Sequence, residues 1–188
     1  MKRRYLAFFA LLCTTGPLVC EPISDLRAFH AAWVVAQDGK QHGEAAMILG
    51  GLDVFTRLSP HALTEDETLG PTWEKQIDAL RAEVLFLSRS GPAVLPRQTS
   101  VRRLPAQILT VAPGEQVQVT LPDGGNQAAL VLNDVHLRII MANVAGTPLC
   151  ATKRNALFCA LDAGQTMHAR FLNEGRETAE VLLLGEPR

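Results

Sequence analysis

The sequence has few aromatic residues and no apolar run long enough to cross a membrane as a helix. Phe, Tyr and Trp together make up 5% of its 188 residues. The apolar run Tyr5–Cys13 is shorter than the roughly 20 residues that a spanning helix needs, and no other segment is apolar enough. We therefore expect a core built mainly from Leu, Val, Ile and Ala, and no membrane-spanning helix.

Familiar catalytic and nucleotide-binding motifs are also missing. There is no Gly-x-Ser-x-Gly elbow, no Walker loop and no Gly-x-Gly-x-x-Gly. The five histidines form no His-Glu-x-x-His zinc pattern, and His42-Gly43-Glu44 lacks the Pro-Cys-x-x-Cys partner found in zinc deaminases. His30 falls on the apolar side of a predicted helix, where we interpret it as a packing residue. We predict a protein without catalytic activity, metal or cofactor.

The N-terminus has the layout of a secretory signal peptide. Three cations, Lys2-Arg3-Arg4, precede the apolar run, and Thr14-Thr15-Gly16-Pro17 interrupts it. We assign residues 1–20 to the signal and expect an exported bacterial protein of the periplasm or cell surface. Cleavage after Cys20 would discard that cysteine, whereas a lipoprotein signal would acylate it. Only in the second case do we expect contact with a membrane.

The charge balance argues against a nucleic-acid partner. The whole chain has a net charge of -1, and removal of the signal with its three cations leaves about -4. Residues 21–90 hold eleven acids and six bases, whereas residues 91–188 hold eight acids and nine bases. This division is typical of differently solvated faces, although it would also help the two halves to dock.

Residues 21–90 have the pattern of three helices. Apolar residues recur every three or four positions in residues 26–34, in the segment Glu44 to Leu58 and again after residue 72. Gly50-Gly51 in the second segment indicates a close helix approach or a break. The third segment is the clearest, with the alternating spacing of a helix-packing seam formed by Trp73, Ile77, Leu80, Val84 and Leu87.

The second half of the chain has the pattern of strands. Prolines and arginines in residues 91–105 indicate a semi-stiff linker. From residue 106 onward, short stretches with a period of two are separated by turns such as Pro122-Asp123-Gly124-Gly125. We count seven or eight strands and predict an antiparallel β-sandwich of the jelly-roll type over residues 106–188. The predicted fold class is therefore α+β.

Two cysteines in the second half, Cys150 and Cys159, are predicted to form a disulfide. An even pair in an exported chain favours oxidation, and the spacing is not that of a Cys-x-x-Cys redox or metal site. The pair lies symmetrically about Arg154-Asn155. If those residues form a hairpin turn, the cysteines face each other across two paired strands, with Cα atoms about 4.5 Å apart.

Two His-x-Arg sequences lie on predicted strands, His136-Leu137-Arg138 and His168-Ala169-Arg170. In each, the histidine and the arginine share one face of the strand. If the strands are neighbours, His136, Arg138, His168 and Arg170 would form a basic patch for an anionic partner, strengthened as the histidines gain protons. The alternative is an ordinary solvated face of the sheet.

Parts of the second half resemble the bacterial pre-peptidase C-terminal β-sandwich. The resemblance covers residues 107–185 and implies a β-sandwich for this half. The acidic and aromatic residues that such modules often carry in mid-domain are missing, so the resemblance implies no site residue. The matching segments are Val111-Ala112-Pro113-Gly114, Val144-Ala145-Gly146-Thr147 and Phe171-Leu172-Asn173-Glu174-Gly175.

Three functions follow as hypotheses. The helix seam and the lack of motifs favour a non-catalytic protein that binds or assembles with another envelope protein. A periplasmic binding module for a small or anionic ligand would need a concave polar pocket. A hydrolase without a familiar motif would need converging histidine, acid and hydroxyl side chains.

Overall fold

The computed structural model describes residues 24–62, 70–88, 102–121, 125–133, 135–152, 155–160 and 166–185. Its helices are α1 (Asp25–His42), α2 (Ala45–Arg57) and α3 (Gly70–Leu87). Its strands are β1 (Leu58–Ala62), β2 (Arg102–Val111), β3 (Gln116–Leu121), β4 (Gln127–Val131), β5 (Leu137–Asn143), β6 (Pro148–Thr152), β7 (Ala156–Cys159), β8 (Met167–Asn173) and β9 (Ala179–Gly185). The predicted α+β class is confirmed, and the predicted signal with Cys20 lies outside the described residues.

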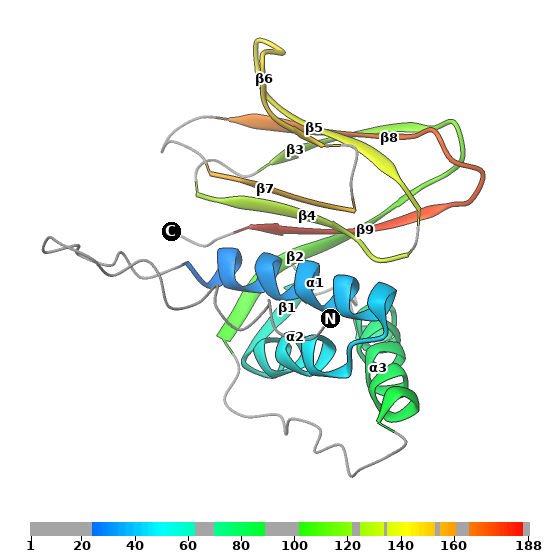
Figure 1. The fold of residues 1–188 in the computed structure, drawn as a ribbon. Helices are drawn as coiled ribbons and strands as arrows, with labels where there is room; N and C mark the ends of the chain where they lie inside the picture. The colour runs from blue at the N-terminus through cyan, green and yellow to red at the C-terminus, as the bar shows by residue number, and fades with distance from the viewer. Residues whose placement is uncertain are drawn as a thin grey trace, which may run out of the picture.

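The elements form three layers (Figure 1). One sheet has five strands in the order β1-β2-β9-β4-β7, and the other has four in the order β3-β8-β5-β6. All pairs of described strands are antiparallel except β1 with β2. The helices pack on one face of the five-stranded sheet, and the four-stranded sheet packs on its other face.

Strand β9, at the centre of the five-stranded sheet, shows how the three layers are joined. Leu182 and Leu184 pack in the cluster that contains the helices, while Val181 and Leu183 pack in the cluster shared with the four-stranded sheet. All four side chains are buried. A strand covered on both faces needs a continuous apolar run, which explains the uninterrupted sequence Val181–Leu184.

An aromatic cluster holds the helical layer together. Phe29 and Trp33 of α1, Phe55 of α2 and Trp73 of α3 have ring centroids 5.0 to 6.2 Å apart. Neighbouring aromatic pairs of this kind each contribute about 0.5–1.5 kcal/mol beyond their area burial. The seam predicted for the third helix is therefore the face through which α3 packs, since Trp73, Leu80 and Val84 are buried. No described helix has the length and apolar character of a membrane span.

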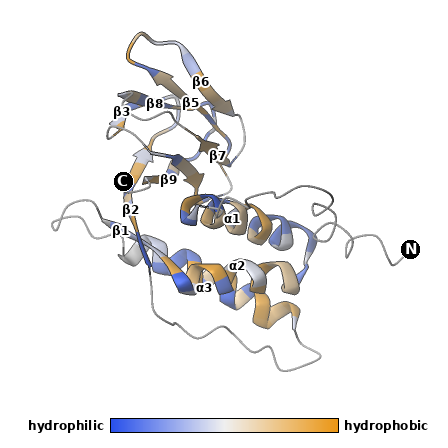
Figure 2. Ribbon diagram, turned by 90° about the vertical axis from the view of Figure 1, so that its left-hand side faces the viewer, coloured by the Kyte–Doolittle hydropathy of each residue, from blue (hydrophilic) through white to orange (hydrophobic). Residues whose placement is uncertain are grey.

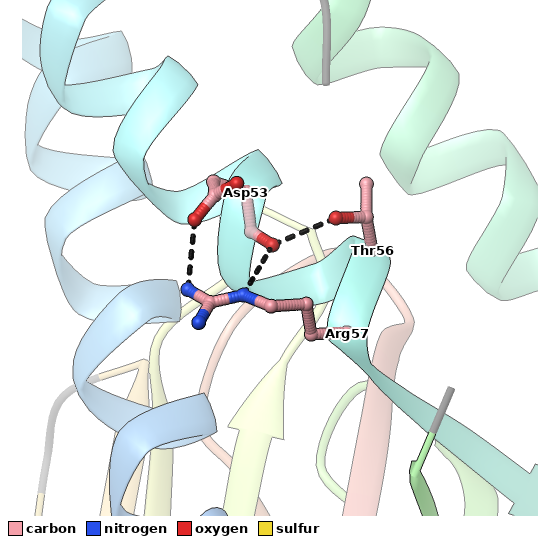
Figure 3. Close-up of polar contacts among 3 residues, drawn as sticks. All are labelled: Asp53, Thr56 and Arg57. Carbon is pink, nitrogen blue, oxygen red and sulfur yellow. Dashed lines mark hydrogen bonds and ion pairs between the residues drawn. The ribbon is translucent and has the colours of Figure 1, made fainter. Parts of the chain in front are cut away.

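Hydrogen bonds between nearby residues define the start of α1 and the end of α2. Ser24 accepts a hydrogen bond from the backbone N–H of Arg27 and caps the start of α1. At the end of α2, the carbonyl oxygen of Asp53 accepts hydrogen bonds from Thr56 Oγ1 and Arg57 Nε, and the Asp53 carboxylate pairs with Arg57 at 2.7 Å (Figure 3). These contacts complete the last helical turn just before the chain becomes extended.

A strand interrupts the predicted helical segment, and this was not expected. Leu58 is already extended, and the next residue, Ser59, stands directly before Pro60, a position that disfavours the helical region, so α2 cannot continue past it. Strand β1 then pairs in parallel with β2, which places Leu58 opposite Arg102. Strand β2 therefore begins at Arg102, inside the predicted linker 91–105. The rest of that segment, residues 91–101, lies outside the described residues.

The predicted disulfide between Cys150 and Cys159 is present, with Cα atoms 5.9 Å apart. The predicted paired hairpin is wrong, however, because β6 lies at the edge of the four-stranded sheet and β7 at the edge of the five-stranded sheet. The chain changes sheets between the two cysteines, so the bridge joins the two sheets. Closing this short loop stabilises the fold by roughly 2–3 kcal/mol.

Candidate functional site

The four-stranded sheet has one buried face and one open face, and the open face lies on the opposite side of the molecule from the helices (Figure 1). We call it the outer sheet face. Its side chains are the alternate residues that do not point into the core shared by the two sheets. They are Gln116, Gln118 and Thr120 of β3, Arg138, Ile140 and Ala142 of β5, Ala151 of β6, and His168, Arg170 and Leu172 of β8.

The register places the two predicted arginines close to each other. Strands β5 and β8 are antiparallel neighbours, with Arg138 opposite Leu172 and Arg170 opposite Ile140. Arg138 and Arg170 are therefore diagonal neighbours, a relation that corresponds to about 7–8 Å between backbones. Arg138 is exposed and Arg170 is half-buried.

The two predicted histidines lie far apart. His168 is opposite Ala142, whereas the exposed His136 precedes β5 by one residue. Six residues of extended chain separate positions 136 and 142, which is about 20 Å. The structure thus brings together Arg138, Arg170 and His168 on one face and leaves His136 beyond its end.

Two side chains of β3 hold the β8 residues in place. Arg170 donates a hydrogen bond from Nε to Gln118 Oε1 at 3.0 Å, and His168 Nδ1 lies 3.2 Å from Thr120 Oγ1. The period of two predicts that alternate residues of a strand share one face, but it carries no signal that β3 pairs with β8. These two partners could be found only from the register.

The outer sheet face is cationic. Among its described side chains are two arginines and one histidine, and none is a carboxylate. The nearest described acids in sequence, Glu115 and Glu174, lie in turns at the ends of β3 and β8, and Glu115 accepts a hydrogen bond from the backbone of Ala112. An anionic partner would thus meet no opposing charge on the strands themselves.

A projecting hairpin borders this face. Strands β5 and β6 are joined by residues 144–147, and all residues from 144 to 149 are exposed. We call residues 144–149 the hairpin tip. It carries two large exposed apolar side chains, Val144 and Leu149. Figures 1 and 2 both place the tip on the far side of the four-stranded sheet from the helices.

Buried apolar side chains from both sheets pack between them. Ile139, Met141, Met167 and Phe171 are fully buried there. Among the described residues, no group of three or more His, Cys, Asp or Glu side chains could hold a metal ion. The arginines, the histidine and the amide and hydroxyl groups on the outer sheet face can bind a partner by charge and hydrogen bonding.

Comparisons with known proteins add similarity but no identification. No protein-family model matches the chain, and no curated protein matches it. Among solved structures it is similar to a de novo designed double-stranded β-helix (17% identity, 43% of this chain and 97% of that chain, TM-score 0.34). It is also similar to CapF with the inhibitor 3-isopropenyl-tropolone (11%, 85% and 43%, 0.34) and to a Pseudomonas putida prolyl-4-hydroxylase (15%, 86% and 86%, 0.32). These scores carry no argument about fold or function, and none of the three is described as a pre-peptidase C-terminal module.

Proposed function

We propose that this protein is a non-catalytic interaction module of the bacterial cell envelope, which binds an acidic partner through its outer sheet face. The observation that carries the proposal is the diagonal pair Arg138 and Arg170 on a face without carboxylates. Guanidinium groups bind carboxylates and phosphates through two parallel hydrogen bonds, so two of them side by side suit a polyanionic surface.

Export to the envelope is part of the same proposal. The N-terminal pattern of cations followed by an apolar run supports it, and so does the disulfide between Cys150 and Cys159, because disulfides persist in oxidising compartments. We also propose that the two sheets form a jelly-roll sandwich. Their shared apolar core and antiparallel pairing support that description.

Binding of polyglutamate tests the proposed function. We expect Arg138→Ala/Arg170→Ala to bind this polymer about tenfold more weakly than the parent, because each exposed charge pair contributes up to about 1 kcal/mol. Dissociation constants from titration calorimetry at low salt would measure the change. Added salt should weaken binding by the parent, since exposed charges are screened.

The matched control is Arg57→Ala/Arg81→Ala, which removes the same charge from the helical layer. Arg57 is exposed and Arg81 is half-buried, and they pair with Asp53 and Asp78 on their own helices. We expect this variant to bind polyglutamate like the parent. Equal weakening by the two double variants would show that net charge, rather than the outer sheet face, drives binding, and would overturn the proposal.

A further inference from the structure

The hairpin tip is an apolar projection beside a cationic face. This combination restricts the kinds of partner that fit the surface. Residues 139–152 contain no charged residue and no histidine. Within this stretch the tip exposes Val144 and Leu149 to 67% and 42%. Next to the tip, Ala142 is opposite His168, and Arg170 follows two residues further along β8. Apolar and cationic groups therefore occupy one continuous surface.

The tip is held in a fixed conformation. The Asn143 N–H donates to the Thr147 carbonyl oxygen, and the Asn143 carbonyl oxygen accepts from the Gly146 N–H. The Asn143 Oδ1 accepts a further hydrogen bond from the Thr147 N–H at 2.9 Å. Gly146 has a φ of 82°, which suits glycine, and a register shift between Met141 and Ala142 bends the hairpin at its base. The tip therefore loses little conformational entropy when it binds a partner, which favours association.

The size of the tip favours a lipid surface over a protein. A stable protein interface buries about 800 Å² on each partner, more than two projecting side chains provide. An interfacial membrane segment instead places a few apolar side chains about 5–10 Å into the headgroup region, while neighbouring cations attract anionic lipids. The tip and the outer sheet face both lie on the side of the molecule that is turned away from the helices (Figures 1 and 2).

We propose that the protein docks on an anionic lipid surface, with Val144 and Leu149 inserted among the headgroups and Arg138 and Arg170 facing lipid phosphates. This inference rests on the proposed function, because it assigns the acidic partner of the outer sheet face to a membrane. Docking requires no acylation at Cys20, since the contact is made by the opposite half of the chain.

Sedimentation with phosphatidylglycerol-containing vesicles tests the inference. We expect Val144→Ser/Leu149→Ser to lower the partition coefficient about a hundredfold, because each of the two inserted apolar side chains contributes roughly a factor of ten. The same variant should bind polyglutamate like the parent. Val34→Ser/Val35→Ser is the matched control, since these α1 side chains are exposed to 44% and 41% and lie in the helical layer. It should partition like the parent.

A tryptophan at the tip gives a second readout that a folding defect would not imitate. Brominated phosphatidylglycerol should quench Leu149→Trp more strongly than the parent, whose Trp33 and Trp73 are buried in the helical layer. Polyglutamate binding without vesicle binding would overturn the inference and leave the proposed function standing. Loss of both would overturn both. A fall in molecular mass in Val144→Ser/Leu149→Ser would instead identify the tip as a contact between two copies.

Discussion

At the scale of single residues, His30 couples the fold to pH. Its ring centroid lies 5.9 Å from that of Phe158 in β7, and the Arg27 guanidinium carbon lies 5.4 Å from the same centroid. The buried Nε2 of His30 has no hydrogen-bond partner among the described residues. Burial lowers the pKa of His30, because desolvation disfavours its charged form. Protonation in place would add a second cation beside Phe158.

The stability of the protein should therefore fall in mild acid. Below about pH 6.5 the unfolded chain takes up a proton that folded His30 resists, so the free energy of unfolding decreases until the folded state is protonated as well. Urea unfolding across this range should show a smaller decrease in His30→Gln than in the parent. His42→Gln, which changes an exposed histidine on the same helix, should retain the decrease. Identical pH profiles for the parent and His30→Gln would contradict this assignment.

Arg170 shows what sequence alone could give for a single residue. The period of two placed it on an outward face together with His168, and the structure agrees. Its contact with Gln118 could not be predicted, because the strand beside β8 is chosen by the packing of the whole sheet. The contact uses Nε, and a guanidinium has two further nitrogens that can donate to a carboxylate.

At the scale of elements, the glycine pair in α2 has two different roles. A Cβ atom at Gly51 would lie 2.7 Å from Ala36 Cβ and 2.9 Å from the Ala32 carbonyl oxygen, so this position sets the approach of α1 to α2. No described atom lies within 4 Å of a Cβ placed at Gly50. Of the two interpretations left open by the sequence, close approach holds at Gly51.

Alanine substitutions should separate the two glycines. We expect Gly51→Ala to lower the free energy of unfolding by about 1–3 kcal/mol through overpacking. Gly50→Ala should raise it by up to about 1 kcal/mol, because alanine is the better helix former. Urea unfolding of the two variants measures both effects. Changes of the same sign would contradict the packing of α1 against Gly51.

Local sequence patterns predicted the helices and most strands, but they could not predict which distant segments pair in a sheet. The apolar seam of α3 and the alternation of apolar and polar residues in β3 can each be recognised within one short stretch of sequence. Strand β1 is five residues long, and its partner β2 begins some forty residues later, so only the finished sheet reveals it. The disulfide between Cys150 and Cys159 was predicted correctly from the expected oxidising compartment and the even number of cysteines. The spacing of the two cysteines does not show that the chain changes sheets between them.

At the scale of the whole molecule, charge and layers coincide. The described residues of the helical half, 24–62 and 70–88, hold seven acids and five bases. The outer sheet face, which carries no carboxylate among its described side chains, lies on the other side of the five-stranded sheet. Such an asymmetric charge distribution orients a protein in the field of an anionic surface. We therefore expect the molecule to approach a partner with the four-stranded sheet leading and the helices facing away.

An NMR titration of the protein with polyglutamate tests most directly where the partner binds. We predict that the largest chemical-shift changes fall on outward residues of β3, β5 and β8, including the side-chain Nε–H groups of Arg138 and Arg170. Signals of α1, α2 and α3 should hardly move. Shift changes concentrated in the helices, or binding that leaves both arginine Nε–H signals in place, would contradict a binding site on the outer sheet face.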